Sequence, residues 1–118
     1  GVVMYSTVAT SRGMTFHASI AAAKSGVEGL AISLAAELAS KKVRFNVVAP
    51  SLTDTPLAER LLNNEKRREA SADRHPLKRV GEAGDIAAAT LYLLSEEASW
   101  VTGQRLGVDG GLSMVSGL

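Results

Sequence analysis

Residues 43–50 have the sequence VRFNVVAP, a short apolar and β-branched run that ends at a proline. We expect a buried strand over residues 43–49, stopped by Pro50. Upstream, apolar residues recur at three- and four-residue spacing over residues 16–40, which predicts a long amphipathic helix. Residues 2–6, VVMYS, form another short apolar run of strand type. Strand, helix and strand in this order favour a parallel pair joined by a crossover helix.

Downstream of Pro50 the sequence is more interrupted. Residues 50–56 are expected to form a loop, and a short helix is expected to begin at Pro56 with Thr55 as its cap. Residues 63–75, NNEKRREASADRH, are highly polar, and we expect them to be mobile. Residues 76–84 are expected to connect this region to the next helix.

The last part of the chain again has regular patterns. Residues 85–94 predict an amphipathic helix with Asp85 or Gly84 near its start, where the Asp85 carboxylate complements the helix dipole. Residues 104–108, QRLGV, predict a strand that a turn at residues 109–111 ends, and we expect Trp100 in the core or an interface. The whole pattern indicates an α/β protein with a partial doubly wound, Rossmann-like parallel sheet of about three strands. We expect a single domain over residues 1–118.

Composition excludes several classes of function. The chain has 118 residues and a net charge of +1, which gives no electrostatic footprint for nucleic acid. It has no cysteine, so disulfides and thiolate metal sites are excluded. No apolar run reaches the roughly 20 residues of a membrane helix. We therefore expect a cytoplasmic protein with no nucleic-acid, membrane or metal partner.

Several segments together resemble the carboxy-terminal half of the short-chain dehydrogenase/reductase family. The resemblance runs from one end of the chain to the other, and the order and spacing of the segments make it specific. The segments are Ser6-Thr7, HASIAAAK (residues 17–24), SGVEGL (residues 25–30), VRFNVVAP (residues 43–50), Thr55-Pro56, PLKRVG (residues 76–81), Asp85-Ile86-Ala87, TGQ (residues 102–104) and VDGG (residues 108–111).

The resemblance implies hydride transfer between a nicotinamide and the carbon of an alcohol or ketone. In the family a tyrosine moves the proton, a lysine four residues later lowers the tyrosine pKa, and a serine orients the substrate oxygen. Lys24 fits the lysine, but Ile20 occupies the tyrosine position, and Thr7 occupies that of the serine. Tyr5 and Tyr92 are the only tyrosines, and neither is in register to replace the missing one. Structural alternatives stay open: Lys24 as an exposed helix lysine, and Thr7 as a hydrogen-bonding residue at a strand end.

The resemblance also implies NAD or NADP as cofactor. The family binds its pyrophosphate on a glycine-rich turn before a helix, and no Gly-x-x-x-Gly-x-Gly sequence occurs in these 118 residues. Contacts on the nicotinamide side remain as candidates, with Ser51 in place of the family's usual glycine; they are Lys24, Pro50, Ser51, Thr53 and Thr55. We expect this chain not to bind the cofactor tightly.

Three functions are compatible with these features. The first is an oxidoreductase fragment that is inactive alone. The second is a non-enzymatic oligomerisation or interaction module, and the third is one half of a split enzyme, which Ile20 argues against because a partner would not restore the tyrosine. In the resembled family the last helix and last strand form one dimer interface, so we expect a homodimer or higher oligomer through residues 83–94 and the last strand.

Overall fold

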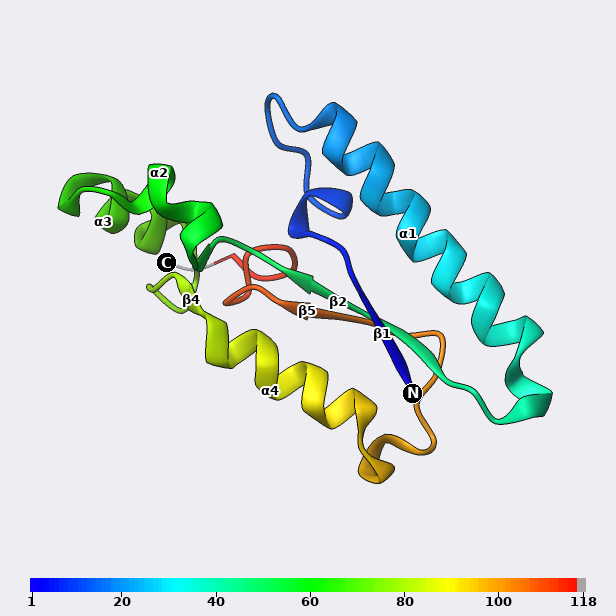
Figure 1. The fold of residues 1–118 in the computed structure, drawn as a ribbon. Coiled ribbons are helices and arrows are strands. Elements are labelled where there is room, and N and C mark those ends of the chain that lie inside the picture. Colours follow the sequence, from blue (N-terminus) through cyan, green and yellow to red (C-terminus); the bar gives the residue numbers. More distant parts are fainter. Residues whose placement is uncertain (117–118) are drawn as a thin grey trace.

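A three-stranded parallel sheet forms the centre of the molecule in the computed structural model, which describes residues 1–116 (Figure 1). Its strands are β1 (Val2–Tyr5), β2 (Phe45–Pro50) and β5 (Arg105–Val108), in the order β1-β2-β5. Both neighbouring pairs are parallel, which confirms the α/β class and the topology expected from the sequence. Pro50 is the last residue of β2 rather than the first one after it.

Two helices cover the sheet. The long helix α1 (Ala18–Glu37) lies against one face, and α4 (Ala83–Leu94) lies against the other (Figure 1). Within α1 only Ala31 and Ala35 are fully buried, since these small residues let the helix approach the sheet closely. Leu30 belongs to the predicted apolar stripe, yet half of its side chain is exposed. The apolar stripe predicted for α1 therefore includes the face that packs on the sheet, but it also includes residues outside that face.

The ends of α1 differ slightly from the predicted range of 16–40. Phe16 has a φ of 61°, a left-handed conformation that no helix continues, so α1 starts after it. At the other end, a short 3-10 turn (Ala39–Lys41) follows α1 and closes at Lys42, which has a φ of 60°. These two backbone positions set the limits of the helix.

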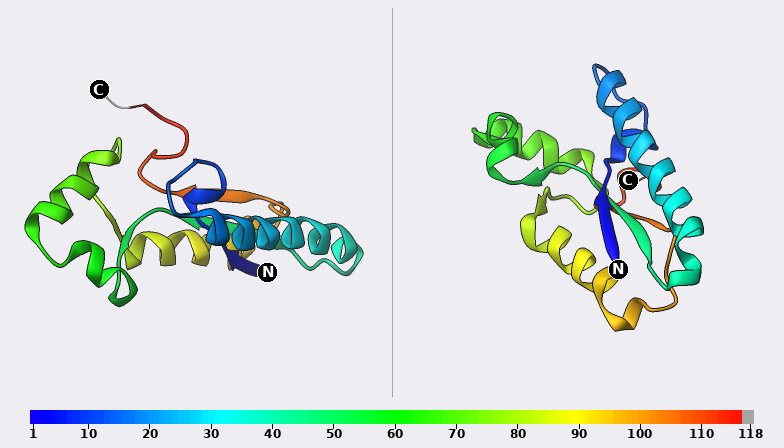
Figure 2. Two further views of the ribbon diagram at one scale, coloured as in Figure 1. Left: turned by 90° about the horizontal axis from the view of Figure 1, so that it is seen from above. Right: turned by 45° about the vertical axis from the view of Figure 1, so that its right-hand side comes forward.

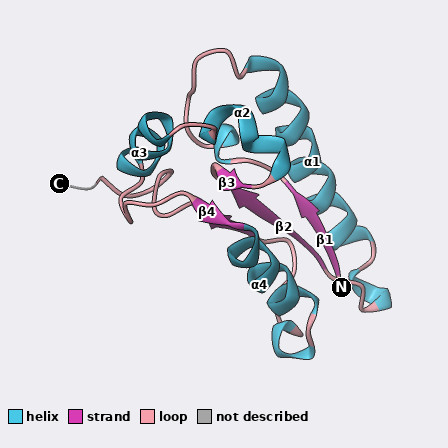
Figure 3. Cartoon of the chain, turned by 60° about the vertical axis from the view of Figure 1, so that its left-hand side comes forward, coloured by secondary structure: helices cyan, strands magenta, loops and turns pink. Residues whose placement is uncertain are grey.

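The segment after β2 contains more structure than its sequence suggested. Thr53–Asp54 form a short strand, β3, which pairs in parallel with β4 (Gly81–Glu82) (Figure 3). The loop expected over residues 50–56 and the connector expected over residues 76–84 thus pair with each other as two short parallel strands. Gly81 allows this approach, because a Cβ there would lie 3.1 Å from the Thr53 hydroxyl.

The polar region 63–75, which we expected to be mobile, contains a regular helix. A 3-10 turn (Pro56–Ala58) and α2 (Glu59–Leu62) lead into helix α3 (Glu65–Arg74). Figure 2 shows α2 and α3 together beyond one end of the central sheet. The Asn64 side chain caps α3 by accepting from the Arg67 N–H at 2.8 Å, which satisfies a donor that the helix start leaves unpaired.

The core of the sheet lies on β2, where Val48 and Ala49 have no exposed surface. Asn46, also on β2, is buried but fully satisfied. Its amide donates to the Val101 carbonyl at 2.9 Å and accepts from the Gln104 N–H at 3.0 Å, which fixes the entry to β5. Trp100, expected in the core or an interface, is 95% exposed, so the core expectation was wrong.

Side chains form hydrogen bonds with backbone groups at both ends of α4. At its start the Glu82 and Asp85 side chains form a capping box, so the helix begins two residues earlier than predicted. At its end the Arg44 guanidinium donates to the carbonyls of Leu93 at 2.8 Å and Ser95 at 3.2 Å. A cation at this position complements the negative end of the helix dipole.

Candidate functional site

The carboxyl ends of the three parallel strands meet at one edge of the sheet. Ser6 and Thr7 follow β1, Ser51 follows β2, and Asp109 follows β5. Ligand sites of open α/β sheets form at this edge. The topology therefore brings the predicted residues after β1 and β2 to the place where such a site is expected.

Thr7 is held at the start of a 3-10 turn (Val8–Thr10). Its Oγ1 accepts from the Ala9 N–H at 3.3 Å, and its carbonyl accepts from the Thr10 hydroxyl at 3.0 Å and from Arg105 at 3.2 Å. The Thr7 hydroxyl thus acts as a cap, and its own proton remains available for another acceptor.

Lys24 is in contact with β1, the strand that precedes Thr7. Its Nζ donates to the Tyr5 carbonyl at 3.1 Å, so the lysine is anchored to the sheet rather than extended into solvent. Ile20 lies one helical turn earlier, on the same side of α1, and 42% of it is exposed. The position at which we expected the family's proton donor is thus accessible and carries an aliphatic side chain.

Neither tyrosine can take over that role. The Tyr5 hydroxyl is hydrogen-bonded to Thr90 Oγ1 at 2.9 Å. Thr90 belongs to α4, whereas Lys24 belongs to α1 on the opposite face of the sheet. Tyr92 also lies on α4. The sequence register had already excluded both residues, and the geometry agrees.

A network of charged and polar side chains behind Thr7 was not anticipated from the sequence. Glu28 accepts from the Ser6 hydroxyl at 2.7 Å and pairs with Arg105, whose Nε lies 2.7 Å from Oε1. The Arg105 Nε is buried and makes no aligned hydrogen bond, so charge attraction holds it there. A further nitrogen of Arg105 contacts Thr10 Oγ1 at 3.1 Å, which links α1 and β5 to the turn after β1.

The loop after β2 holds the remaining candidate residues. Ser51 Oγ lies 2.8 Å from Nε2 of His75, and Thr53 Oγ1 donates to the Ser51 carbonyl at 3.0 Å. Thr55 occupies the N-cap position before Pro56, but its side chain makes no capping hydrogen bond, so that expectation was only half correct. His75, missed from the sequence, is 2% exposed.

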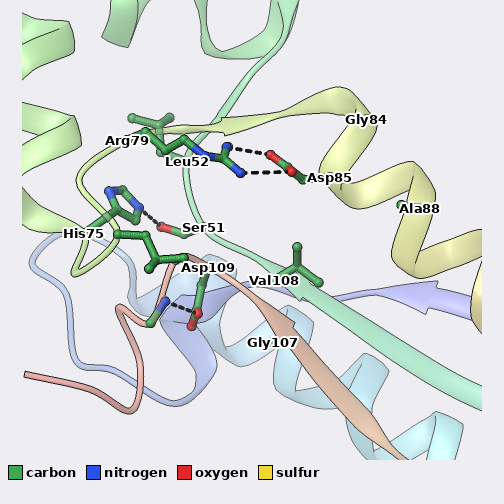
Figure 4. A pocket seen from close by; sticks show the side chains of 14 residues that line it. Ser51, Leu52, His75, Arg79, Gly84, Asp85, Ala88, Gly107, Val108 and Asp109 are labelled. Carbon is green, nitrogen blue, oxygen red and sulfur yellow. Dashed lines mark hydrogen bonds and ion pairs between the residues drawn. The ribbon is translucent and has the colours of Figure 1, made fainter.

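A cavity of about 430 Å³ lies between these loops and the start of α4 (Figure 4). Ser51, His75 and Asp109 line it, as do Arg79 and Asp85. The Arg79 guanidinium binds both Asp85 oxygens, at 2.7 and 3.0 Å. These hydrogen bonds, with one from the Glu82 N–H, lower the pKa of Asp85 from 3.8 to about 2.

Asp109 is also a carboxylate at neutral pH. Burial alone would raise its pKa, but hydrogen bonds from the Ser113 hydroxyl and from the N–H groups of Gly111 and Ser113 lower it overall. These contacts shape the turn at residues 109–111, where Gly110 and Gly111 have φ values of 60° and 90°. The turn predicted from the glycine pair is confirmed.

The residues present do not form a complete dinucleotide site. Lys24 Nζ contacts the Tyr5 carbonyl, and Ile20, one helical turn before it, has an aliphatic side chain with no ionisable group. The 118 residues also contain no glycine-rich pyrophosphate turn. Within the described residues, no group of three His, Cys, Asp or Glu side chains could hold a metal ion.

Comparison with known proteins agrees with the fold and the motifs. A family model described as enoyl-(acyl carrier protein) reductase matches residues 1–113. A 3-oxoacyl-[acyl-carrier-protein] reductase from Thermotoga maritima is 42% identical over 111 residues, which cover 94% of this chain and 44% of that protein. The chain thus spans less than half the length of the curated relatives it matches.

Solved structures give the same result. A short-chain type dehydrogenase/reductase from Mycobacterium ulcerans superposes with a TM-score of 0.89 at 35% identity, covering 98% of this chain and 42% of that one. A 4-hydroxyisoleucine dehydrogenase complexed with NADH gives a TM-score of 0.90 at 25% identity, covering 97% and 47%. The chain belongs to the short-chain dehydrogenase/reductase family. Among residues 1–116, no helix is both long and apolar enough to cross a membrane.

Proposed function

We propose that this chain is the part of an NAD(P)-dependent alcohol or ketone oxidoreductase that holds the nicotinamide and the substrate, and that alone it does not complete the reaction. The observation that carries this proposal is Ile20, which stands one helical turn before the anchored Lys24. Without an ionisable group at that point, no side chain delivers the proton that must accompany hydride transfer.

The family and the retained residues support the oxidoreductase origin. The Thermotoga maritima relative is named for reduction of a 3-oxoacyl group, and a ketone is the substrate class that we propose here. Thr7 keeps a hydroxyl for the substrate oxygen, while Lys24 keeps the cation for the nicotinamide ribose. We propose Pro50, Ser51, Thr53 and Thr55 as the remaining contacts on the nicotinamide side.

Dinucleotide affinity tests the part of this proposal that says the chain is insufficient alone. Titration of NADH and of NADPH fluorescence with the purified chain should show no saturation, with a Kd weaker than roughly 1 mM. The expected cause is the lack of a pyrophosphate cradle in these 118 residues. A Lys24→Met variant is the matched control, and any residual signal should fall with it. Saturable binding in the micromolar range would contradict the proposal.

A second role, oligomerisation, is supported by exposed apolar side chains. On α4, Leu91 is 68% exposed and Leu94 is 45% exposed. The neighbouring strand β5 is an edge of the sheet, and its Leu106 is 39% exposed. Apolar surface beside an unpaired strand edge favours association. We propose a homodimer or higher oligomer through α4 and β5.

A further inference from the structure

The Ser51–His75 pair has a single hydrogen-bond direction when the imidazole is neutral. His75 Nδ1 lies 2.7 Å from the Ser71 carbonyl, which can only accept, so Nδ1 carries the ring proton. Nε2 is then the unprotonated nitrogen, and Ser51 Oγ at 2.8 Å must donate to it. A hydroxyl is thus paired with a base whose orientation a third group fixes.

The surroundings of the imidazole hold this arrangement rigidly. His75 is 2% exposed, at the end of α3. A Cβ added to Gly110 would lie 3.5 Å from the ring carbon Cδ2, so the glycine turn packs on the ring edge. The next residues are also fixed, because the Leu77 N–H donates to the Gly110 carbonyl at 3.1 Å. The base is therefore buried and held in one orientation.

The cavity gives an electrophile access to the serine. Ser51 and His75 both line it, and Leu52, Leu77 and Val108 supply apolar wall (Figure 4). Gly110 lines the same cavity, and its backbone N–H donates no hydrogen bond within the described part of the chain. Such a donor is what an oxygen gaining negative charge requires.

The charges around the cavity select the kind of electrophile. Arg79 is neutralised by Asp85, and Asp109 adds a carboxylate whose lowered pKa keeps it ionised. The remaining negative charge of Asp109 would repel an anionic substrate. An uncharged ester or thioester with a small apolar acyl group fits both the charge and the apolar wall.

We propose that Ser51 is a nucleophile activated by His75, which accepts acyl groups from uncharged esters or thioesters in this cavity. Ser51 Oγ bonds to the carbonyl carbon while its proton passes to His75 Nε2. The bond from that carbon to the leaving oxygen or sulfur breaks, and Nε2 returns the proton to the leaving alcohol or thiol. Water then cleaves the Ser51 ester by the same proton path. This activity requires neither a nicotinamide nor hydride transfer, but it uses Ser51, which we also propose as a contact on the nicotinamide side.

An alkyl fluorophosphonate tests the nucleophile, because its P–F bond breaks as Ser51 Oγ bonds to phosphorus and fluoride leaves. Incubation of the whole chain, followed by intact mass and peptide mapping, should give one adduct, on Ser51. Ser51→Ala should abolish the adduct, and His75→Gln should slow it about 100-fold, the lower range for a general base. Circular dichroism should show that both variants stay folded.

Two controls make the result decisive. Ser95→Ala should label at the unaltered rate, because the Ser95 hydroxyl donates to the Tyr92 carbonyl rather than to an imidazole. The chain unfolded in urea should not label at Ser51, because the pair exists only in the fold. No adduct on the folded chain, an adduct at another residue, or equal labelling in urea would each overturn the proposal.

Discussion

At the scale of single residues, the proposed function depends on Lys24 and Ile20. The relation of Ile20 to Lys24 was predictable from the sequence, because helical periodicity fixes which side chains share a face. The hydrogen-bond partner of Lys24 could not be predicted from the sequence. Its ammonium binds the Tyr5 carbonyl, a contact that depends on how closely α1 approaches β1.

Returning a phenol to this position tests whether Lys24 still acts on it. In Ile20→Tyr, the new phenol should titrate with a pKa about 1 unit or more below an ordinary tyrosine, because a cation nearby favours the phenolate. The measurement is the difference in phenolate absorbance against pH between the variant and the parent chain, which subtracts Tyr5 and Tyr92.

The matched control is the double variant Ile20→Tyr with Lys24→Met. In it the new phenol should titrate in the ordinary range of about 10. Equal titration curves for the single and double variants would show that Lys24 is too far from position 20 to influence it.

Other residues of the site carried no signal in the sequence. His75 lies in a polar stretch, and nothing local indicates that its ring is buried against Gly110. Glu28 and Arg105 are charged residues on separate elements, and only the packing of α1 on the sheet brings them within 2.7 Å. Contacts between distant segments depend on tertiary structure, which residue patterns do not encode locally.

At the scale of elements, the long and periodic segments were predictable and the short ones were not. Strands β1, β2 and β5 and helices α1 and α4 follow from runs and repeats that match a single period. The ribbon of β3 and β4 has only two residues per strand, too few to show alternation. Helix α3 is polar on most sides, and the Asn64 cap was its only local indication.

The start of α4 predicts a specific response to acid. Asp85 has a folded-state pKa of about 2, below its ordinary value of 3.8, so its stabilising contribution is present above pH 3.8 and is lost as pH falls toward 2. Asp85→Asn should therefore lower the free energy of unfolding most at neutral pH. The deficit relative to the parent chain should shrink as pH falls through this window.

Urea unfolding at a series of pH values measures the deficit. Asp73→Asn is the control, because Asp73 is exposed and its carboxylate forms no ion pair among residues 1–116. It should change stability little at any pH. An Asp85→Asn deficit that stays constant from neutral pH to pH 2 would show that the capping contact does not depend on charge.

At the scale of the whole molecule, α1, the central sheet and α4 form three layers, and both helices leave apolar side chains facing outward. On α1, Leu30 is 51% exposed and Ile32 is 60% exposed, and α4 exposes Leu91 to a greater degree. The sequence predicted an apolar stripe on each helix, but that stripe is wider than the face that lies against the sheet. That division depends on the rotation of each helix, which small residues such as Ala31 and Ala35 set by packing closest to the strands.

Leu91 tests the proposed oligomer. Leu91→Glu places a charge on the outward face of α4 and should convert the oligomer to monomer, because burying an unpaired carboxylate is unfavourable. Sedimentation velocity at micromolar concentration measures the change. Leu57→Glu is the control, since Leu57 is 97% exposed and lies outside α4 and β5, and it should leave the assembly unchanged. A parent chain that sediments as a monomer would refute the proposed oligomer.

The central place of β2 has a consequence for synthesis on the ribosome. Its contact with the entry of β5 joins Asn46 to Gln104, residues 58 positions apart. The ribosome therefore releases β1, α1 and β2 well before the strand that covers the second edge of β2. High contact order slows folding, and an apolar edge exposed in the interval favours aggregation. We expect the nascent chain to depend on chaperones until β5 has emerged from the exit tunnel.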